Sequence, residues 1–168
     1  MQNRYAEIKT ERLFLRTLTD ADLAMVRDTG ITQDDWKNDS DVLNWIRWTN
    51  THHICFMFYI WLAQTNQLIG RVYLHSKKEL NHEVELAYGI QEKYRNNGYA
   101  TEAAKAAIHF AFTQAGLNEL VAIVAPDNIP SLRVIEKLNF IHCGMRTVFD
   151  NGKDCEFNYF KLCKRAFL

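Results

Sequence analysis

The stretch at residues 94–103, with the sequence YRNNGYATEA, constrains the fold of this chain more than any other. It follows a strand-like run at residues 83–90 and leads directly into an alanine-rich run with the pattern of a helix. Gly98 allows backbone torsion angles and a close approach that a side chain would block, and Asn96 and Asn97 also tolerate a positive φ. A strand, a tight loop with free backbone N–H groups and a helix N-terminus form the geometry that holds a pyrophosphate. The sequence therefore predicts an anion-binding loop here.

Length and composition indicate a single globular domain over residues 1–168. With 48% hydrophobic residues among 168, the chain can bury about two-thirds of its unfolded surface. Twenty basic residues balance twenty acidic ones, so no overall field draws the chain to nucleic acid or to an anionic membrane. The four cysteines include no CxxC pair, and no apolar segment follows the polar start. We therefore expect a cytoplasmic protein with reduced thiols.

Neither a membrane span nor a metal site is expected. The apolar run at residues 54–62 has nine residues, whereas a spanning helix needs roughly 20. Its aromatic content is typical of a buried strand. The histidines have neither an i, i+4 spacing on a helix nor cysteine companions, so no metal ligand set is predicted.

Hydrophobic periodicity predicts alternating strands and helices without a linker or an internal repeat. Strands are expected at residues 13–16, 54–62, 68–75, 83–90, 120–125, 141–149 and 153–162. Helices are expected after the capping pair Thr19 and Asp22, along the face made by Val42, Trp45, Ile46 and Thr49, and at residues 100–115 and 130–138. The order β-α-α-β-β-β-α-β-α-β-β predicts a mixed α/β (α+β) fold with one central sheet.

Two segments in this order resemble the GNAT N-acetyltransferases. The first is the loop Arg95-x-x-Gly98-x-Ala100, and the second is residues 128–140, with the sequence NIPSLRVIEKLNF. The resemblance covers nearly the whole chain and is closest to the branch of ribosomal-protein N-terminal acetyltransferases (RimJ/RimL-like). It implies one GNAT domain with a mostly antiparallel mixed sheet, and an acetyl-CoA-dependent enzyme. Asn139 replaces the glycine that usually ends the second motif, but asparagine can also form a left-handed helix cap.

The resemblance also implies where acetyl-CoA binds. Its pyrophosphate would lie on the backbone amides of the loop and of the first helical turn. Its pantetheine arm would pair with the exposed edge of the strand that ends at residues 90–91, as an added strand does. Two polar residues of the second motif would hydrogen-bond the cofactor. The expected cofactor-binding residues are Ile90, Gln91, Arg95, Asn96, Asn97, Gly98, Tyr99, Ala100, Thr101, Asn128 and Ser131.

Direct acetyl transfer needs no protein nucleophile. The amine loses a proton, attacks the acetyl carbonyl and passes through a tetrahedral oxyanion before the coenzyme A thiolate leaves. Glu83 and Glu85, two residues apart on one side of the predicted strand, are candidates to accept the proton directly or through water. Tyr159 resembles the tyrosine found at that place in relatives and would protonate the thiolate, and Ser131 is a rival donor.

Simpler interpretations of the same residues stay open. The loop can be an ordinary turn, Asn128 can cap a helix, and the two glutamates can pair with neighbouring lysines or arginines. Tyr159 can be a packed strand aromatic. A cluster of aspartates is either a solvated loop or an acidic lip of the amine site. Its members are Asp34, Asp35, Asp39 and Asp41.

The acceptor is not determined by the sequence. A protein N-terminal α-amine, a polyamine, an aminoglycoside and an amino acid all remain candidates, and residues 29–51, where relatives carry their acceptor-binding helices, are the least patterned part of the chain. The protein is expected to be a monomer or a homodimer. A non-catalytic acyl-CoA-binding or regulatory module is the alternative function. A nucleotide-binding protein is disfavoured because neither Gly-Lys-Ser/Thr nor GxGxxG occurs.

Overall fold

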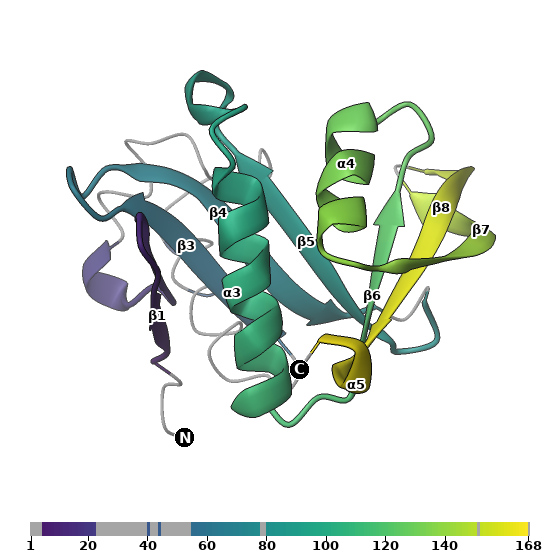
Figure 1. The fold of residues 1–168 in the computed structure, drawn as a ribbon, viewed down its shortest axis with the longest axis horizontal. Coiled ribbons are helices and arrows are strands. Elements are labelled where there is room, and N and C mark those ends of the chain that lie inside the picture. Colours follow the sequence, from purple (N-terminus) through teal and green to yellow (C-terminus); the bar gives the residue numbers. More distant parts are fainter. Residues whose placement is uncertain are drawn as a thin grey trace.

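The computed structural model describes residues 5–22, 40, 44, 55–77, 80–150 and 152–167 (Figure 1). The strands are β1 (Glu7–Lys9), β2 (Leu13–Arg16), β3 (Cys55–Leu62), β4 (Leu68–Ser76), β5 (Val84–Ile90), β6 (Glu119–Val124), β7 (Ile141–Asp150) and β8 (Lys153–Cys163). The α-helices are α3 (Tyr99–Thr113), α4 (Ile129–Lys137) and α5 (Lys164–Phe167), and the 3-10 helices are η1 (Asp20–Asp22) and η3 (Glu92–Tyr94). No helix within these described ranges is long and apolar enough to cross a membrane.

The eight strands form one sheet in the order β1-β2-β3-β4-β5-β6-β8-β7. Neighbouring strands are antiparallel except β5 and β6, which run parallel and are paired only at Glu85 and Val121. Past this pair the two strands separate toward their carboxyl ends, with α3 on one side and α4 on the other (Figure 1). We call this the β5–β6 fork. The expected mixed α/β fold with one mostly antiparallel sheet is confirmed.

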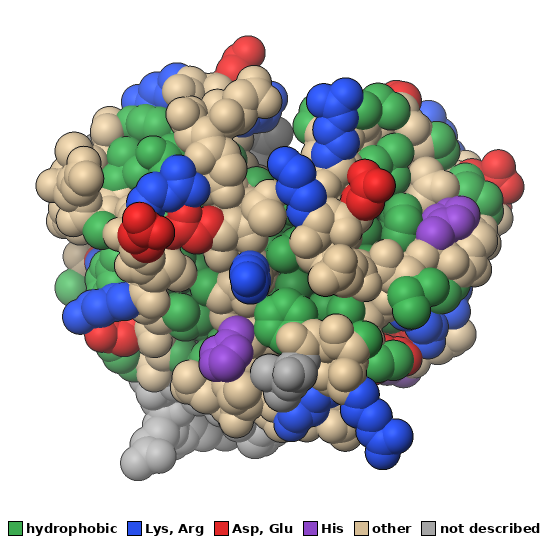
Figure 2. All heavy atoms as spheres, in the orientation of Figure 1, with side chains coloured by type: hydrophobic (Ala, Val, Ile, Leu, Met, Phe, Trp, Pro, Cys, Tyr) green, Lys and Arg blue, Asp and Glu red, His purple; other side chains and the backbone are tan. Residues whose placement is uncertain are grey.

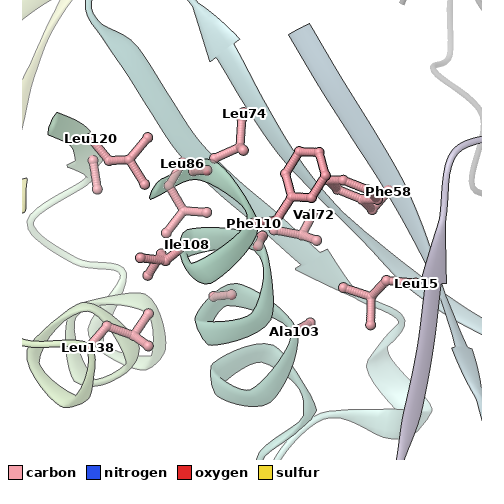
Figure 3. Packing of buried hydrophobic residues seen from close by; sticks show 14 of the residues in the cluster. Leu15, Phe58, Val72, Leu74, Leu86, Ala103, Ile108, Phe110, Leu120 and Leu138 are labelled. Atoms are coloured by element: carbon pink, nitrogen blue, oxygen red, sulfur yellow. The ribbon is translucent and has the colours of Figure 1, made fainter. Parts of the chain in front are cut away.

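Helix α3 packs closely on the sheet because its buried face is made of small residues. Ala103, Ala104, Ala107 and Ala111 are all fully buried. Among these alanines Phe110 contacts two β3 aromatics edge-on, with ring centroids 4.9 Å from Phe56 and 5.0 Å from Phe58. Figure 3 shows Phe110 and Ile108 projecting from α3 among strand residues such as Val72 and Leu86. The main core therefore lies between the helices and one face of the sheet.

The observed elements differ from the predicted ones mainly at the ends of the chain. All the predicted strands are present, with bounds that agree to within one residue. The predictions missed β1, which pairs with β2 over three residues and is too short to show a period, and the short α5. Thr19 and Asp22 do form the expected cap, since the Asp22 carboxylate accepts from the Thr19 N–H at 2.8 Å.

Two expectations fall outside the described residues. They are the helix face with Val42, Trp45, Ile46 and Thr49, and the aspartate cluster of Asp34, Asp35, Asp39 and Asp41. The acceptor segment expected at residues 29–51 is likewise described only at residues 40 and 44.

Candidate active site at the β5–β6 fork

The fork leaves one edge of β5 without a strand partner among the described residues. Beyond Glu85 no residue of β5 pairs with β6, whereas the other edge of β5 pairs with β4 along its whole length. An extended ligand can add to such an edge through main-chain hydrogen bonds. At its end, Gln91 donates its backbone N–H to Ile69 O at 2.8 Å and precedes η3. Ile90 and Gln91 thus lie where the free edge meets the predicted anion loop.

The loop that follows has the backbone conformation that the sequence predicts. Asn96 has φ +64° and Gly98 has φ +79°, both in the left-handed region. Gly98 is the N-cap of α3 and offers no side chain to the first-turn N–H groups of the helix, which belong to Tyr99, Ala100 and Thr101. These amides remain available for an anion. Figure 2 shows a hollow at this end of the molecule, between α3 and α4, with Lys and Arg side chains beside it.

The side chains of the loop stabilise the loop itself. Arg95 donates its Nε–H to Ile90 O at 3.0 Å, and Asn97 donates its side-chain amide to the carbonyls of Tyr94 and Arg95 at 3.2 and 2.9 Å. The Arg95 Nε–H and the Asn97 side-chain amide are therefore engaged within the loop. The loop, the free strand edge and the helix N-terminus together fit the phosphate and pantetheine parts of coenzyme A.

Residues far away in the sequence hold the loop from outside. Thr10, just before β2, donates its hydroxyl to Glu102 Oε1 at 2.6 Å, and Arg12 donates its Nε–H to Glu102 Oε2 at 2.7 Å. Arg12 also donates Nη1–H to Asn97 O at 3.0 Å. We call Thr10, Arg12 and Glu102 the Arg12 cluster. This cluster was not predicted from the sequence. The available signal was Glu102 itself, because an acidic residue beside a predicted anion site needs a compensating cation.

On the other side of the fork, Asn128 and Ser131 begin α4. The Asn128 side-chain oxygen accepts from the Ser131 N–H at 3.2 Å, which makes Asn128 the helix N-cap. The Ser131 hydroxyl lies 2.9 Å from the hydroxyl of Tyr88 on β5. This contact joins the two sides of the fork, and Tyr88 was not singled out from the sequence. Burial raises the pKa of Tyr88, and the hydrogen bond to Ser131 only partly offsets this.

Glu83 lies among three donors on the opposite face of the sheet. Tyr159 donates its hydroxyl to Glu83 Oε1 at 2.7 Å, Lys161 Nζ lies 2.9 Å from the same oxygen, and Arg146 Nη1 lies 2.7 Å from Oε2. Burial raises the pKa of Glu83, but these hydrogen bonds and the Arg146 charge outweigh burial and hold the pKa below its usual value. Glu83 is therefore a carboxylate at neutral pH.

Glu85 and Tyr159 have contrasting surroundings. Glu85 is 4% exposed, forms an ion pair with Lys77 at 2.7 Å, and sits at the single β5–β6 pair where the fork begins. Tyr159 is buried, with the Arg146 guanidinium 3.7 Å from the centre of its ring. Burial and the hydrogen bond to Glu83 raise the pKa of Tyr159. Both glutamates thus form the ion pairs that the simpler interpretation of the sequence expects.

Comparisons with known proteins agree with this geometry. A family model described as an acetyltransferase (GNAT) domain matches residues 12–141. The chain belongs to the GNAT acetyltransferase family. It is accordingly an acetyl-CoA-dependent acetyltransferase. Of the two functions expected from the sequence, the family favours the enzyme over the non-catalytic acyl-CoA-binding module. The crystal structure of an acetyltransferase (GNAT family) from Bacillus anthracis is 26% identical, with a TM-score of 0.74, over 95% of this chain and 99% of that chain.

Two further GNAT structures share the fold at lower identity. The ribosomal-protein-S5-alanine acetyltransferase from Vibrio fischeri has a TM-score of 0.75 at 16% identity, covering 97% of this chain and 99% of that chain. The spermidine N-acetyltransferase from Vibrio cholerae, solved in complex with CoA and spermine, has a TM-score of 0.76 at 18% identity, covering 94% and 99%. Among the residues described, no group of three or more His, Cys, Asp or Glu side chains is arranged to hold a metal ion.

Proposed function

We propose that this GNAT protein transfers the acetyl group of acetyl-CoA to a primary amine in the β5–β6 fork. The observation that carries the proposal is the single pairing point at Glu85 and Val121, because it frees a strand edge between two helix N-termini. A free edge accepts an extended amide chain, and an uncapped helix N-terminus accepts a phosphate. The whole catalytic unit is proposed to be one domain over residues 1–168, in a cytoplasmic monomer or homodimer.

The proposed cofactor contacts follow the sequence prediction. The pyrophosphate would be held by the backbone amides of residues 95–100, with Thr101 in the first turn of α3. The pantetheine arm would pair with β5 up to Ile90 and Gln91. Asn128 and Ser131 would contact the cofactor from α4, where Asn128 is already the helix cap. Capping uses one lone pair of the side-chain oxygen, so capping and cofactor binding are compatible.

The thioester supplies an activated acetyl group, and the protein has to accept one proton and donate another. The amine nitrogen loses one proton as its bond to the acetyl carbon forms, and the coenzyme A sulfur takes up one as the carbon–sulfur bond breaks. We propose Glu85 or Glu83 as the proton acceptor, directly or through water. Glu85 is the better placed of the two, because it lies where the fork begins.

Tyr159 and Ser131 are the two proposed donors to the departing thiolate. The Tyr159 proton is shared with Glu83 at 2.7 Å, so donation would require this bond to break. Ser131 is held at 2.9 Å by Tyr88 at the fork itself. Either hydroxyl can be the donor in this pair, so donation to the sulfur would require the serine proton to turn away from Tyr88. We favour Ser131 over Tyr159 because Ser131 lies at the fork, next to the free edge of β5.

For the acceptor, we propose the RimJ/RimL-like branch and hence a protein N-terminal α-amine, with a small amine such as a polyamine as the alternative. Two observations support this proposal. The chain belongs to the GNAT family, and two structures with the same fold are named as a ribosomal-protein acetyltransferase and a spermidine acetyltransferase. Release of coenzyme A thiol from acetyl-CoA, with N-terminal peptides and small amines in parallel, identifies the acceptor. The proposal fails if neither class gives thiol release above hydrolysis.

The pH dependence of the same assay tests the proposed base. An alkyl amine of pKa about 10.4 costs roughly 4–5 kcal/mol to deprotonate at pH 7, whereas an α-amine of pKa about 8 costs only about 1.4. With an alkyl amine, Glu85→Gln should lower turnover strongly at pH 7 and less at pH 9. Glu156→Gln, at an exposed position of β8, is the matched control and should change nothing. Full turnover of both Glu85→Gln and Glu83→Gln at both pH values would exclude these carboxylates as the base.

A further inference from the structure

Glu102 poses an electrostatic problem for the proposed cofactor site. It lies in the first turn of α3, at the helix end whose amides are proposed to hold the pyrophosphate. A carboxylate at a helix N-terminus stabilises the helix, but beside a bound phosphate it is a like charge. Its pKa is lowered, because hydrogen bonds from Thr10 and Arg12 outweigh the effect of burial. Glu102 is therefore charged at neutral pH, and its charge needs a partner.

Arg12 supplies that partner and also contacts the loop. Its Nε and Nη2 lie 2.7 and 2.6 Å from Glu102 Oε2. Its Nη1 donates to Asn97 O, and its guanidinium lies 4.8 Å from the centre of the Tyr99 ring. A Cβ atom built on Gly98 would come within 3.4 Å of Arg12 Nη2. One side chain therefore lies against three consecutive residues of the loop and helix start, Asn97, Gly98 and Tyr99.

The backbone of the loop needs such support. Asn96 holds a positive φ of 64°, in the left-handed region that few residues other than glycine and asparagine adopt. Glu102 also accepts from the backbone N–H of Arg12 at 3.1 Å, so the turn between β1 and β2 is tied to α3 through both the backbone and the side chain of Arg12. These bonds join residues about 90 apart in the sequence and are independent of any ligand.

We propose that Arg12 and Glu102, with Thr10, are positioning residues that hold the cofactor loop ready for binding, and that Arg12 cancels the Glu102 charge so that the α3 N-terminus can accept a phosphate. Arg12 acts through Glu102 and Asn97 rather than as a phosphate ligand. This inference rests on the proposed function, and it adds residues that neither loop motif contains.

The test is a double-mutant cycle on coenzyme A affinity, measured by titration calorimetry with the full chain. Arg12→Met leaves Glu102 unpaired, and we expect coenzyme A to bind about tenfold more weakly. Glu102→Gln removes the charge and keeps an oxygen that accepts from Thr10 and from the residue 12 N–H. The double variant Arg12→Met/Glu102→Gln should therefore recover to within about threefold of the unchanged protein. Arg165→Met is the control for loss of one positive charge; Arg165 is exposed on α5, which contacts α3 near its other end.

Amide hydrogen exchange without coenzyme A gives a readout that does not depend on binding. In Arg12→Met, exchange should quicken at the N–H groups of Arg95 and Glu102, which bond to Glu92 O and Gly98 O on either side of the loop, while exchange in β7 and β8 stays unchanged. If Arg12→Met loses as much affinity in the Glu102→Gln background as in the unchanged protein, and amide exchange in the loop is unchanged, Arg12 contacts the phosphate directly, and the inference is overturned. Unchanged affinity and exchange in Arg12→Met would also overturn it. If the unchanged protein itself fails to bind coenzyme A, the proposed function fails instead.

Discussion

Gly70 is a position where adding a single methyl group should disturb β5, the strand that borders the proposed active site. Gly70 on β4 pairs with Ile90, the last residue of β5. A Cβ atom at residue 70 would lie 2.3 Å from Gly89 O and 2.8 Å from Ile90 Cδ1. The side-chain atom can rotate away, but the carbonyl oxygen belongs to the sheet backbone. Gly70→Ala therefore has to push β5 away from β4.

Gly89 provides a matched control on the adjoining strand. A Cβ atom there meets nothing within 4 Å, and its backbone needs no positive φ. Gly→Ala at such a site stabilises a protein by about 0.4–1 kcal/mol through the unfolded state, whereas overpacking costs about 1–3 kcal/mol. The unfolded-state effect is common to both variants, so the free energies of unfolding of Gly70→Ala and Gly89→Ala should differ by the overpacking cost, about 1–3 kcal/mol. For a chain of this size each kcal/mol corresponds to about 2–4 °C in Tm.

Urea denaturation followed by far-UV circular dichroism measures the difference directly. The two variants carry the same chemical change on neighbouring strands, so the comparison cancels the general effect of alanine in a sheet. Equal stability of Gly70→Ala and Gly89→Ala would refute the reasoning, because it would mean that β4 and β5 are not packed as closely at this point as the 2.3 Å approach requires.

Three other outcomes are expected. Gly98→Val should weaken coenzyme A binding by at least tenfold in a thermal-shift titration, because a β-branched residue disfavours the φ of +79° and its side chain would meet Arg12 and the proposed phosphate position. Asn128→Ala should cost only about 1 kcal/mol of affinity. Glu83→Gln should destabilise the protein at pH 7, and because the folded pKa of Glu83 is lowered, the difference in unfolding free energy should disappear as the pH falls from about 5 to about 3. Phe110→Ala should cost about 3–5 kcal/mol in urea denaturation, because it removes the ring that contacts Phe56 and Phe58.

The parts that the sequence predicted correctly are those that short-range sterics determine. Strand alternation, the small-residue face of α3 and the loop with a positive φ at Gly98 depend on residues within a few positions of one another. The same holds for the Asn128 cap. The family resemblance rests on these local patterns as well, which is why it identified the expected cofactor loop. Strand β1 was not predicted, because its three residues are too few to show the alternation of a strand.

Contacts between residues that are far apart in the sequence depend on the tertiary structure. Strand β8 lies between β6 and β7, and this order brings Tyr159 and Lys161 to Glu83. No periodicity encodes that order, because a hairpin can attach to a sheet through either of its strands. Likewise Tyr88 meets Ser131 only because β5 and β6 separate.

Local torsional preferences were enough to predict the backbone conformation of the loop at residues 95–100, because a glycine at residue 98 allows a positive φ whatever surrounds it. Which side chains contact that loop from elsewhere in the chain depends on the tertiary structure. Arg12 and Glu102 are 90 positions apart, and a pairing at that separation exists only after α3 has packed on the sheet beside the turn between β1 and β2. The charge state of Glu83 has the same origin, since its three donors come from β7 and β8.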